Sequence, residues 1–195
     1  MVRKLIVATG NPGKLKEMQS YLTDLPWDLR LKPAELDIGE TGTTFIANAR
    51  LKAAEVAKAL GEWAIADDSG LCVDALGGSP GLYSARYGTN DANRIKRLLQ
   101  ELGETVDRQA KFICAVAISN PDGEIVLETE GICRGEILFS NRGNDGFGYD
   151  PIFYVTSQKQ TFAEMTPATK AKISHRGIAF AQLMPKFKKL SDTLL

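Results

Sequence analysis

Two adjacent carboxylates at the end of an apolar run are the first place where the sequence could do chemistry. Residues 63–66 predict a short buried strand, and Asp67-Asp68-Ser69-Gly70 follow it directly. Neighbouring buried carboxylates repel each other and lose hydration, so a cation or hydrogen-bond donors must compensate. Mg²⁺ suits such a site because it prefers oxygen ligands and retains waters. The alternative is an Asx-turn in which one aspartate caps the next element.

A glycine-containing segment, Thr9-Gly10-Asn11-Pro12-Gly13-Lys14, follows another expected strand at residues 5–8 and precedes an expected helix. Its two glycines allow the backbone to approach a ligand closely, and the start of a helix attracts an anion, to which Lys14 adds a full positive charge. The glycine spacing, and Leu15 after the lysine, differ from a Walker P-loop. We interpret the segment as a different kind of phosphate cradle. The alternative is a glycine-rich turn with a surface lysine.

A long helix is predicted at residues 44–60, and a glycine-containing loop with Glu40 precedes it. Asn48 and Lys52 are four residues apart and therefore share one face of this helix. A carboxylate, an amide and an ammonium on one edge could bind a metal and a phosphate. The alternative is a solvated helix flank.

Two later segments carry aromatic and basic side chains. Gly146-Phe147-Gly148-Tyr149-Asp150 places aromatic residues between glycines, where a ring can stack on a nucleobase for about 1–3 kcal/mol. The stretch from Lys170 to Arg176 is rich in donors and contains His175, the only histidine of the chain. The guanidinium of Arg176 offers forked hydrogen-bond donors that suit a carbonyl oxygen at the edge of a base. The alternatives are a basic helix face and a structural histidine.

The order of the expected elements indicates an α/β or α+β fold with a central mixed, twisted sheet and flanking helices. Early strands alternate with helices, whereas residues 111–119 and 124–133 are expected to form a hairpin around Asn120-Pro121-Asp122-Gly123. A final helical region opens at Thr166-Pro167 and is expected to break or bend at Pro185.

The composition describes an ordinary globular protein. The chain has 195 residues, 44% hydrophobic and 25% charged, and its 24 basic and 24 acidic side chains cancel. We therefore expect one domain over residues 1–195 and no dedicated nucleic-acid binder. The three cysteines form no CxxC pair, which argues against a structural zinc site and for buried thiols in a reducing cytosol. The N-terminal segment is too short for a signal peptide, and no apolar run approaches the ~18 residues of a membrane span, so we expect a cytoplasmic protein.

Taken together, the segments resemble the inosine triphosphate pyrophosphatase family, also called the Ham1-like family, over nearly the whole chain. The matching motifs are Thr9-Gly10-Asn11-Pro12-Gly13-Lys14, Glu40-Thr41-Gly42 with Phe45, Ala66-Asp67-Asp68-Ser69-Gly70-Leu71, Pro80-Gly81-Leu82-Tyr83-Ser84-Ala85-Arg86-Tyr87, Gly146-Phe147-Gly148-Tyr149-Asp150-Pro151-Ile152-Phe153 and Ser174-His175-Arg176-Gly177. One departure is Asp145, where bacterial members often have glycine.

The resemblance implies Mg²⁺-dependent hydrolysis of the deaminated purine nucleotides ITP, dITP and XTP to the monophosphate and pyrophosphate, which keeps such purines out of DNA and RNA. It also implies a two-lobed fold with the active-site cleft between the lobes, a homodimer, and no stable nucleic-acid or membrane partner. Glu40 and Asp68 would bind the metal, and Asp68 would also act as the base that activates water. The triphosphate of the substrate would contact Thr9, Gly10, Asn11, Pro12, Gly13, Lys14 and Lys52. Ser69 would also contact the substrate. The base would be surrounded by Phe147, Gly148, Tyr149, Asp150, Lys170, His175 and Arg176.

Two other classes of function stay open on the sequence alone. A nucleotide-binding regulator without turnover would keep the glycine loop and the stacking ring but give the carboxylates only structural roles. A weak nucleic-acid-binding module would use the basic ends of the chain. The zero net charge and the acidic pair argue against the second of these.

Overall fold

The structure is a computed structural model that describes residues 3–23 and 25–194. Its strands are β1 (Arg3–Val7), β2 (Trp27–Leu31), β3 (Trp63–Val73), β4 (Gln109–Ser119), β5 (Ile125–Ile137), β6 (Phe153–Val155) and β7 (Gln160–Thr161). Its α-helices are α1 (Pro12–Leu22), α2 (Phe45–Leu60), α3 (Asp91–Leu102), α4 (Pro167–Ile173) and α5 (His175–Leu194). The strands form one sheet in the order β2-β1-β3-β4-β5-β6-β7. Because β1 pairs in parallel with β2 and β3 while β6 pairs antiparallel with β5 and β7, the predicted mixed sheet with flanking helices is confirmed.

The chain divides into two compact units. Unit 1 comprises residues 1–68, 114–131 and 176–195, and unit 2 comprises residues 69–113 and 132–175. Strands β3, β4 and β5 and helix α5 each contribute residues to both units. The single two-lobed domain over residues 1–195 stays a prediction.

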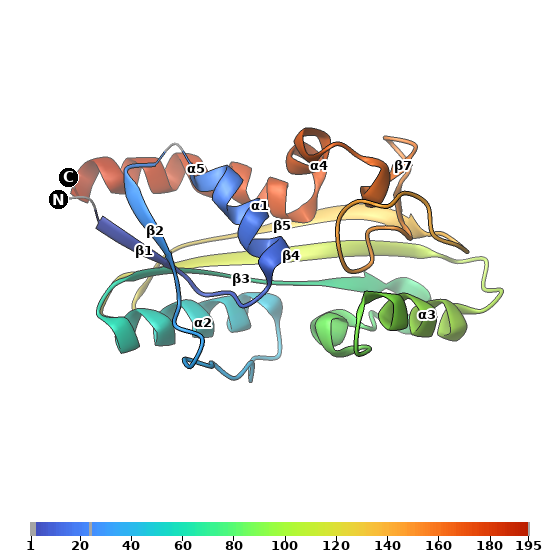
Figure 1. Cartoon of the computed structure of the whole chain (residues 1–195), viewed down its shortest axis with the longest axis horizontal. Helices are drawn as coiled ribbons and strands as arrows, with labels where there is room; N and C mark the ends of the chain where they lie inside the picture. Colours follow the sequence, from blue (N-terminus) through green and yellow to red (C-terminus); the bar gives the residue numbers. More distant parts are fainter. Residues whose placement is uncertain (1–2, 24, 195) are drawn as a thin grey trace. The chain divides into compact units, whose positions relative to one another are not determined.

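Unit 1 is a layer of strands with helices on both faces. Helices α1 and α5 lie on one face, and α2 lies on the other (Figure 1). Tyr21 of α1 stacks on Phe180 of α5 with ring centroids 4.7 Å apart, which ties the two helices together. Helix α2 begins at the N-cap Thr44 and ends at Gly61, whose φ of 63° suits glycine at a C-cap.

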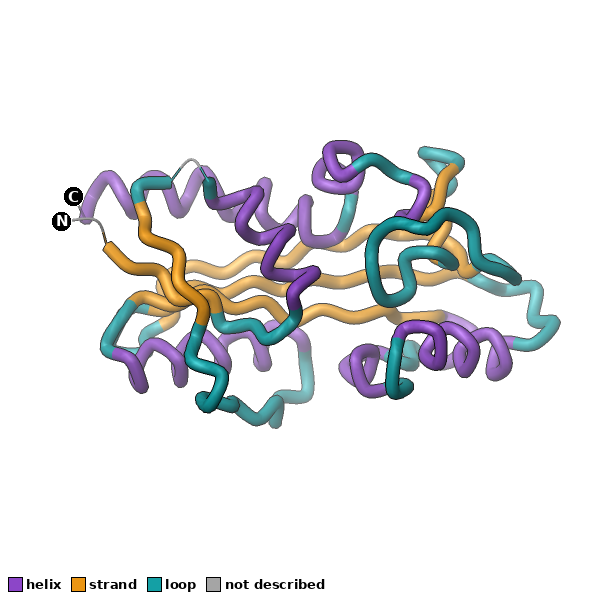
Figure 2. The backbone as a smooth tube through the Cα atoms, in the orientation of Figure 1, coloured by secondary structure: helices purple, strands orange, loops and turns teal. Residues whose placement is uncertain are grey.

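Unit 2 packs α3 and a group of aromatic rings into its own core. Helix α3 begins after the N-cap Asn90, whose side chain accepts a hydrogen bond from the Asn93 amide at 2.9 Å. Its apolar face is buried in a core that also contains Phe112, Phe153 and Phe162. The segment between β5 and β6, residues 138–152, runs entirely as loop (Figure 2).

Two elements extend further than the sequence predicts. Strand β3 does not end at Ala66 but continues through Asp67 and Asp68 to Val73. An Asx-turn was one interpretation of this acidic pair, and the continuous strand overturns it. Helix α5 passes through Pro185 without interruption, because apolar residues on both sides of the proline, Leu183 and Phe187, are buried in the core of unit 1. The break in this region comes at Ser174, which has an extended backbone and separates α4 from α5.

Among the residues that the structure describes, no helix combines the length and the apolar character that a membrane crossing requires.

Candidate functional site

The strand geometry of β3 separates the two carboxylates of the acidic pair. Successive side chains of a strand point to opposite faces, so Asp67 and Asp68 face different sets of partners. Asp67 contacts residues of α1 and α5, whereas Asp68 contacts residues of α2. Each carboxylate therefore has direct partners of its own, although Lys14 and Lys52 influence the pKa of both aspartates.

On one face, Asp67 is fully buried between two cations. Its Oδ2 lies 3.2 Å from Lys14 Nζ and 3.0 Å from Arg176 Nη2. Burial alone raises the pKa of a carboxyl group, but Lys14 and Arg176 hold the pKa of Asp67 well below its usual range. Arg176 also forms an ion pair with Glu17, one turn after Lys14 on α1. The four residues form a series of ion pairs with alternating charge, Lys14, Asp67, Arg176 and Glu17. Because Lys14 and Glu17 both belong to α1, this helix is held at two points.

On the other face, Asp68 accepts a hydrogen bond from Asn48 Nδ2 at 3.0 Å, and its other oxygen lies 3.3 Å from Lys52 Nζ. Lys52 Nζ also lies 2.9 Å from Glu40 Oε1. Burial raises the pKa of Asp68, although Lys52 opposes the shift. Burial lowers the pKa of Lys52, but Asp68, Asp67 and Glu40 together raise it above its usual value. The predicted group Glu40, Asn48, Lys52 and Asp68 is thus brought together.

The oxygen donors of this group fit Mg²⁺. Carboxylates of Glu40 and Asp68 already converge on one cation, the ammonium of Lys52. Mg²⁺ is usually bound by one or two carboxylates together with waters and substrate phosphates, so it does not need a larger protein cage. Among residues 3–23 and 25–194, no three His, Cys, Asp or Glu side chains form a ready metal-binding group.

The glycine loop leads from β1 into α1 as predicted, but amides of the first helical turn already donate hydrogen bonds within the protein. Asn11 is the N-cap, and its Oδ1 accepts hydrogen bonds from the amides of Gly13 and Lys14 at 2.9 and 3.2 Å. The Asn11 amide in turn donates to Thr9 Oγ1 at 3.2 Å. Gly10 faces open space, whereas Pro12 occupies the first helical position. An anion at this helix start would therefore compete with the Asn11 side chain for the amides.

In unit 2, the loop before β6 presents Phe147 half-buried beside an ion pair. Asp150 Oδ2 accepts hydrogen bonds from Lys170 Nζ at 2.7 Å and from the Phe147 amide at 2.8 Å. Lys170 Nζ lies 4.8 Å from the centroid of the Phe147 ring, a cation–π contact. One carboxylate therefore fixes both the ring and the ammonium, and the structure brings the predicted residues Phe147, Asp150 and Lys170 together.

Two other predicted residues of unit 2 have structural partners. The His175 ring stacks on Phe112 with centroids 4.6 Å apart and an interplanar angle of 13°. Tyr149 is buried in the core of unit 2, and its hydroxyl donates to the Ser84 carbonyl at 3.0 Å. Burial raises the pKa of Tyr149. Ser69 lies half-buried in β3 at the start of unit 2.

Arg176 follows His175 in the sequence but has its partners in unit 1. Only 1% of its side chain is exposed, and its guanidinium pairs with Asp67 and Glu17. From the sequence, Arg176 is expected at the base and Asp67 is expected only as half of an acidic pair, while no role is expected for Glu17. The spacing of Lys14 and Glu17, three residues apart, is the only signal that links these groups, because the partners come from three separate segments.

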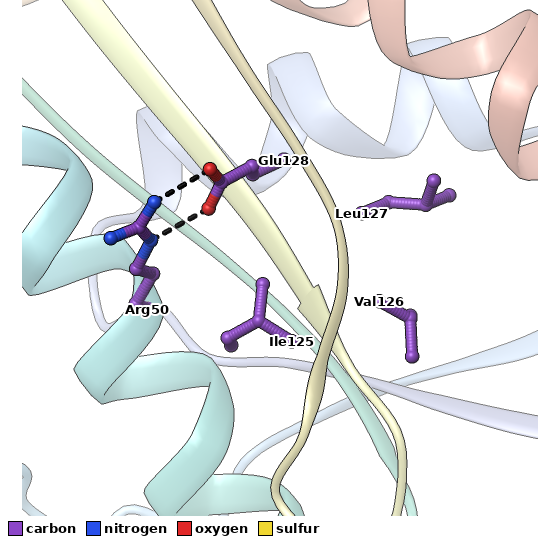
Figure 3. A pocket seen from close by; sticks show the side chains of 5 residues that line it. All are labelled: Arg50, Ile125, Val126, Leu127 and Glu128. Carbon is purple, nitrogen blue, oxygen red and sulfur yellow. Dashed lines mark hydrogen bonds and ion pairs between the residues drawn. The ribbon is translucent and has the colours of Figure 1, made fainter.

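The pocket in Figure 3 is lined by other residues than those described above. It has a volume of about 370 Å³ and is lined by Arg50 of α2 and residues 125–128 of β5. Arg50 and Glu128 form a bidentate ion pair in it, with both N–O distances 2.6 Å. The pair neutralises the charged groups of the pocket, and none of its lining residues is a predicted site residue.

Comparisons with known proteins give a consistent result. Residues 5–186 match the Ham1 family. The dITP/XTP pyrophosphatase of Nostoc sp. (strain PCC 7120) is 65% identical over 186 residues, which cover 95% of both chains. A Ham1 protein from Coxiella burnetii is 42% identical, with a TM-score of 0.85 over 100% of this chain and 98% of that one. The Staphylococcus aureus Ham1 protein is 38% identical, with a TM-score of 0.84 over 99% and 100%. The chain therefore belongs to the Ham1 family.

Proposed function

We propose that the chain is a pyrophosphatase that hydrolyses the deaminated purine nucleotides ITP, dITP and XTP to the monophosphate and pyrophosphate, and so keeps deaminated purines out of DNA and RNA. The observation that carries this proposal is the pair of opposed environments at the middle of β3. Asp67 is held ionised by Lys14 and Arg176, while burial raises the pKa of Asp68. Carboxylates whose pKa values are pushed apart are a signature of acid–base chemistry. The family and its curated relatives support the same reaction.

Asp68 is the proposed general base. Its raised pKa makes it a stronger acceptor for the proton of an attacking water, and Asn48 orients its carboxylate through a 3.0 Å hydrogen bond. A positioned general base contributes about 10²–10⁴-fold to a rate. The proton of the water passes to an oxygen of Asp68, and the resulting hydroxide oxygen forms the new bond to the α-phosphorus. The bond between the α-phosphorus and the oxygen that bridges it to the β-phosphorus breaks, and pyrophosphate leaves with that oxygen and the electron pair.

The triphosphate is proposed to bind to the charged residues and backbone of unit 1. Lys14 and Lys52 supply positive charge, and the loop from Thr9 to Gly13 supplies the start of α1. Glu40 and Asp68 would hold Mg²⁺, which when bound screens the negative charge of the phosphates. Both lysines are paired with carboxylates in the structure, so phosphate binding exchanges one anionic partner for another.

The purine is proposed to bind to unit 2. Phe147 offers a ring for stacking, and Ser69, Gly148, Tyr149, Asp150, Lys170 and His175 complete the contacts. Because Lys170 Nζ lies over the Phe147 ring, the base stacks on the ring face that the ammonium leaves open. A donor near C6 favours the oxygen of hypoxanthine and xanthine over the amino group of adenine. The proposed contact of Arg176 with the base rests on the resemblance alone, since its guanidinium pairs with Asp67 and Glu17.

Three further properties are proposed with the reaction: a homodimer, a cytoplasmic location and no stable nucleic-acid or membrane partner. The three cysteines are free thiols, which is typical of a reducing compartment; Cys114 and Cys133 are buried as expected, whereas Cys72 is only half-buried. Burial raises the pKa of Cys114 to about 12 and that of Cys133 to about 11, so both thiols are unreactive. Light scattering of the purified chain measures the oligomeric state, and a mass of one protomer would contradict the dimer.

The reaction is tested by incubating the protein with dITP and Mg²⁺. We expect equal amounts of dIMP and pyrophosphate, loss of both products when EDTA removes the metal, and their return when Mg²⁺ is added. Release of orthophosphate with dIDP would contradict the site of cleavage. Tight binding of dITP without any product would favour a nucleotide-binding regulator instead.

A further inference from the structure

A carboxylate outside the predicted site holds the backbone of the loop that carries Phe147. Asp91, the first residue of α3, accepts a hydrogen bond on Oδ2 from the amide of Gly148 at 2.7 Å. The two residues are 57 positions apart in the sequence. We propose that Asp91 is a positioning residue for base recognition: it fixes the Gly148 amide and thereby the ring of the preceding residue, Phe147. The proposal rests on the proposed function, in which Phe147 stacks on the purine.

The loop needs such a contact because its own backbone is permissive. Gly146 and Gly148 have φ values of 83° and 64°, which glycine adopts easily but from which it also departs easily. A Cβ at Gly146 would collide with the Asp150 carboxylate, so glycine is required there. The segment from residue 138 to residue 152 has no helix or strand to restrain it. Its conformation is therefore defined by turn hydrogen bonds, such as that from the Asp150 amide to the Phe147 carbonyl at 3.3 Å, together with side-chain contacts.

Two consecutive amides of this loop each donate to a carboxylate. The Phe147 amide donates to Asp150, which belongs to the same loop, and the Gly148 amide donates to Asp91, which belongs to α3. The Asp150 contact shapes the loop locally. The Asp91 contact fastens the loop to α3, whereas the ion pair between Asp150 and Lys170 connects it to α4. Hydrogen bonds to an ionised acceptor are roughly twice as strong as neutral ones, which suits this anchoring role.

Asp91 is itself well anchored. Its other oxygen, Oδ1, accepts a hydrogen bond from Arg94 Nη1 at 2.6 Å, one turn further along α3, so both oxygens of the carboxylate have a partner. The helix is capped by Asn90 and buries Ile95 and Leu98 in the core of unit 2. A binding residue is held accurately when its support sits on a rigid element, and α3 provides that element.

The expected effect of Asp91→Ala is therefore selective. The KM for dITP rises about tenfold, because a charge-assisted hydrogen bond that orders the stacking ring is lost. The inhibition constant of inorganic tripolyphosphate stays within about twofold, because that probe has no base. A loss of stability alone would not produce this difference between the nucleotide and the tripolyphosphate.

Asn90→Ala is the matched control. It removes the N-cap of the same helix end but leaves the Gly148 contact in place, so the KM for dITP should stay within about twofold. Asp91→Asn keeps one acceptor for the Gly148 amide and should give a KM between those of wild type and Asp91→Ala. Hydrogen exchange at the Gly148 amide measures the contact without any substrate, and it should be faster in Asp91→Ala than in Asn90→Ala.

The outcomes separate the two proposals. If the wild-type protein releases no pyrophosphate from dITP, the proposed function fails and this inference fails with it. If the wild type is active and Asp91→Ala has an unchanged KM, the inference alone fails. An equal rise of KM in Asn90→Ala would also overturn it, because helix stability rather than the Gly148 contact would then be the cause.

Discussion

In unit 1 the charged residues of the candidate site neutralise one another, whereas in unit 2 the rings Phe147 and His175 pack against an ammonium and against another ring. Asp67, Asp68 and Glu40 have Lys14, Lys52 and Arg176 as partners, and these groups come from β3, α1, α2, α5 and the loop before α2. In unit 2, Phe147 and His175 lie against Lys170 and Phe112 respectively.

This difference between the two units corresponds to the two parts of a nucleotide, the charged triphosphate for unit 1 and the flat purine for unit 2. Binding a triphosphate requires charge that can be exchanged between partners, and alternating ion pairs provide it. Binding a purine requires a flat apolar surface whose position is fixed, and rings held by packing and hydrogen bonds provide that. Substitutions in the ion pairs of unit 1 should therefore alter turnover and stability, whereas substitution of the half-buried Phe147 in unit 2 should alter nucleotide affinity.

The largest effect is expected for Asp68→Asn. Removing the proton acceptor should lower kcat for dITP about 10²–10⁴-fold, while the inhibition constant of tripolyphosphate changes much less. Pyrophosphate release measures the first quantity and competition measures the second. Asp28→Asn, on the surface of β2, is the control and should have wild-type kcat. An Asp68→Asn protein with wild-type kcat would remove Asp68 from the reaction.

The next effect is on stability. Asp67→Asn removes one partner from a buried ion pair and leaves Arg176 and Lys14 incompletely compensated, which should lower the free energy of unfolding by about 3 kcal/mol at neutral pH. Urea unfolding measures the change. A difference below about 1 kcal/mol, the level of an exposed pair, would show that the charges of this cluster are not coupled.

For the same variant, Asp67→Asn, we also predict how its effect on the free energy of unfolding depends on pH. The pKa of Asp67 is lowered in the folded state, so its contribution is fully present above the ordinary aspartate value of about 4 and is lost as the pH falls through the folded-state pKa. The difference in unfolding free energy between wild type and Asp67→Asn should be constant above about pH 5 and shrink below about pH 4. A difference that grows in acid would contradict the ionised state of Asp67.

In unit 2, Phe147→Ala should raise the KM for dITP about tenfold, within the range of about 1–3 kcal/mol for a stacked base, and leave tripolyphosphate inhibition unchanged. Phe139→Ala is the matched control, because Phe139 belongs to the same unit and is 61% exposed. If the two variants have the same KM, Phe147 does not contact the base.

The smallest effect is expected for Glu128→Gln, which breaks the bidentate pair with Arg50 shown in Figure 3. Both side chains are substantially exposed, so solvent screens the interaction. The Tm should change by at most about 3 °C. A change as large as that of Asp67→Asn would mean that burial does not decide the strength of ion pairs in unit 1.

Local patterns were sufficient for much of the fold. The alternation of apolar runs and helical periodicity predicted the mixed sheet, and the motif Asn120-Pro121-Asp122-Gly123 predicted the turn after β4, where the Gly123 amide donates to the Asn120 carbonyl at 3.0 Å. The predicted break at Pro185 is wrong, since α5 continues through it and Leu183 and Phe187 on its two sides are buried in the core of unit 1, whereas the alternative of a bend stays a prediction. Where a local preference and the core disagree, the core decides.

The sequence by itself determined which residue types are available for chemistry: an acidic pair after an apolar run, a glycine loop before a helix, aromatic rings between glycines, and the family that combines them. Only the tertiary structure decided the partners, namely that Asp67 and Asp68 face different helices, that Arg176 pairs with Glu17 and Asp67, and that Asp91 holds Gly148. The physical reason is that hydrogen bonds and ion pairs act over a few ångströms in space. Residues more than 50 positions apart become neighbours only when the chain folds, and no local pattern encodes that distance.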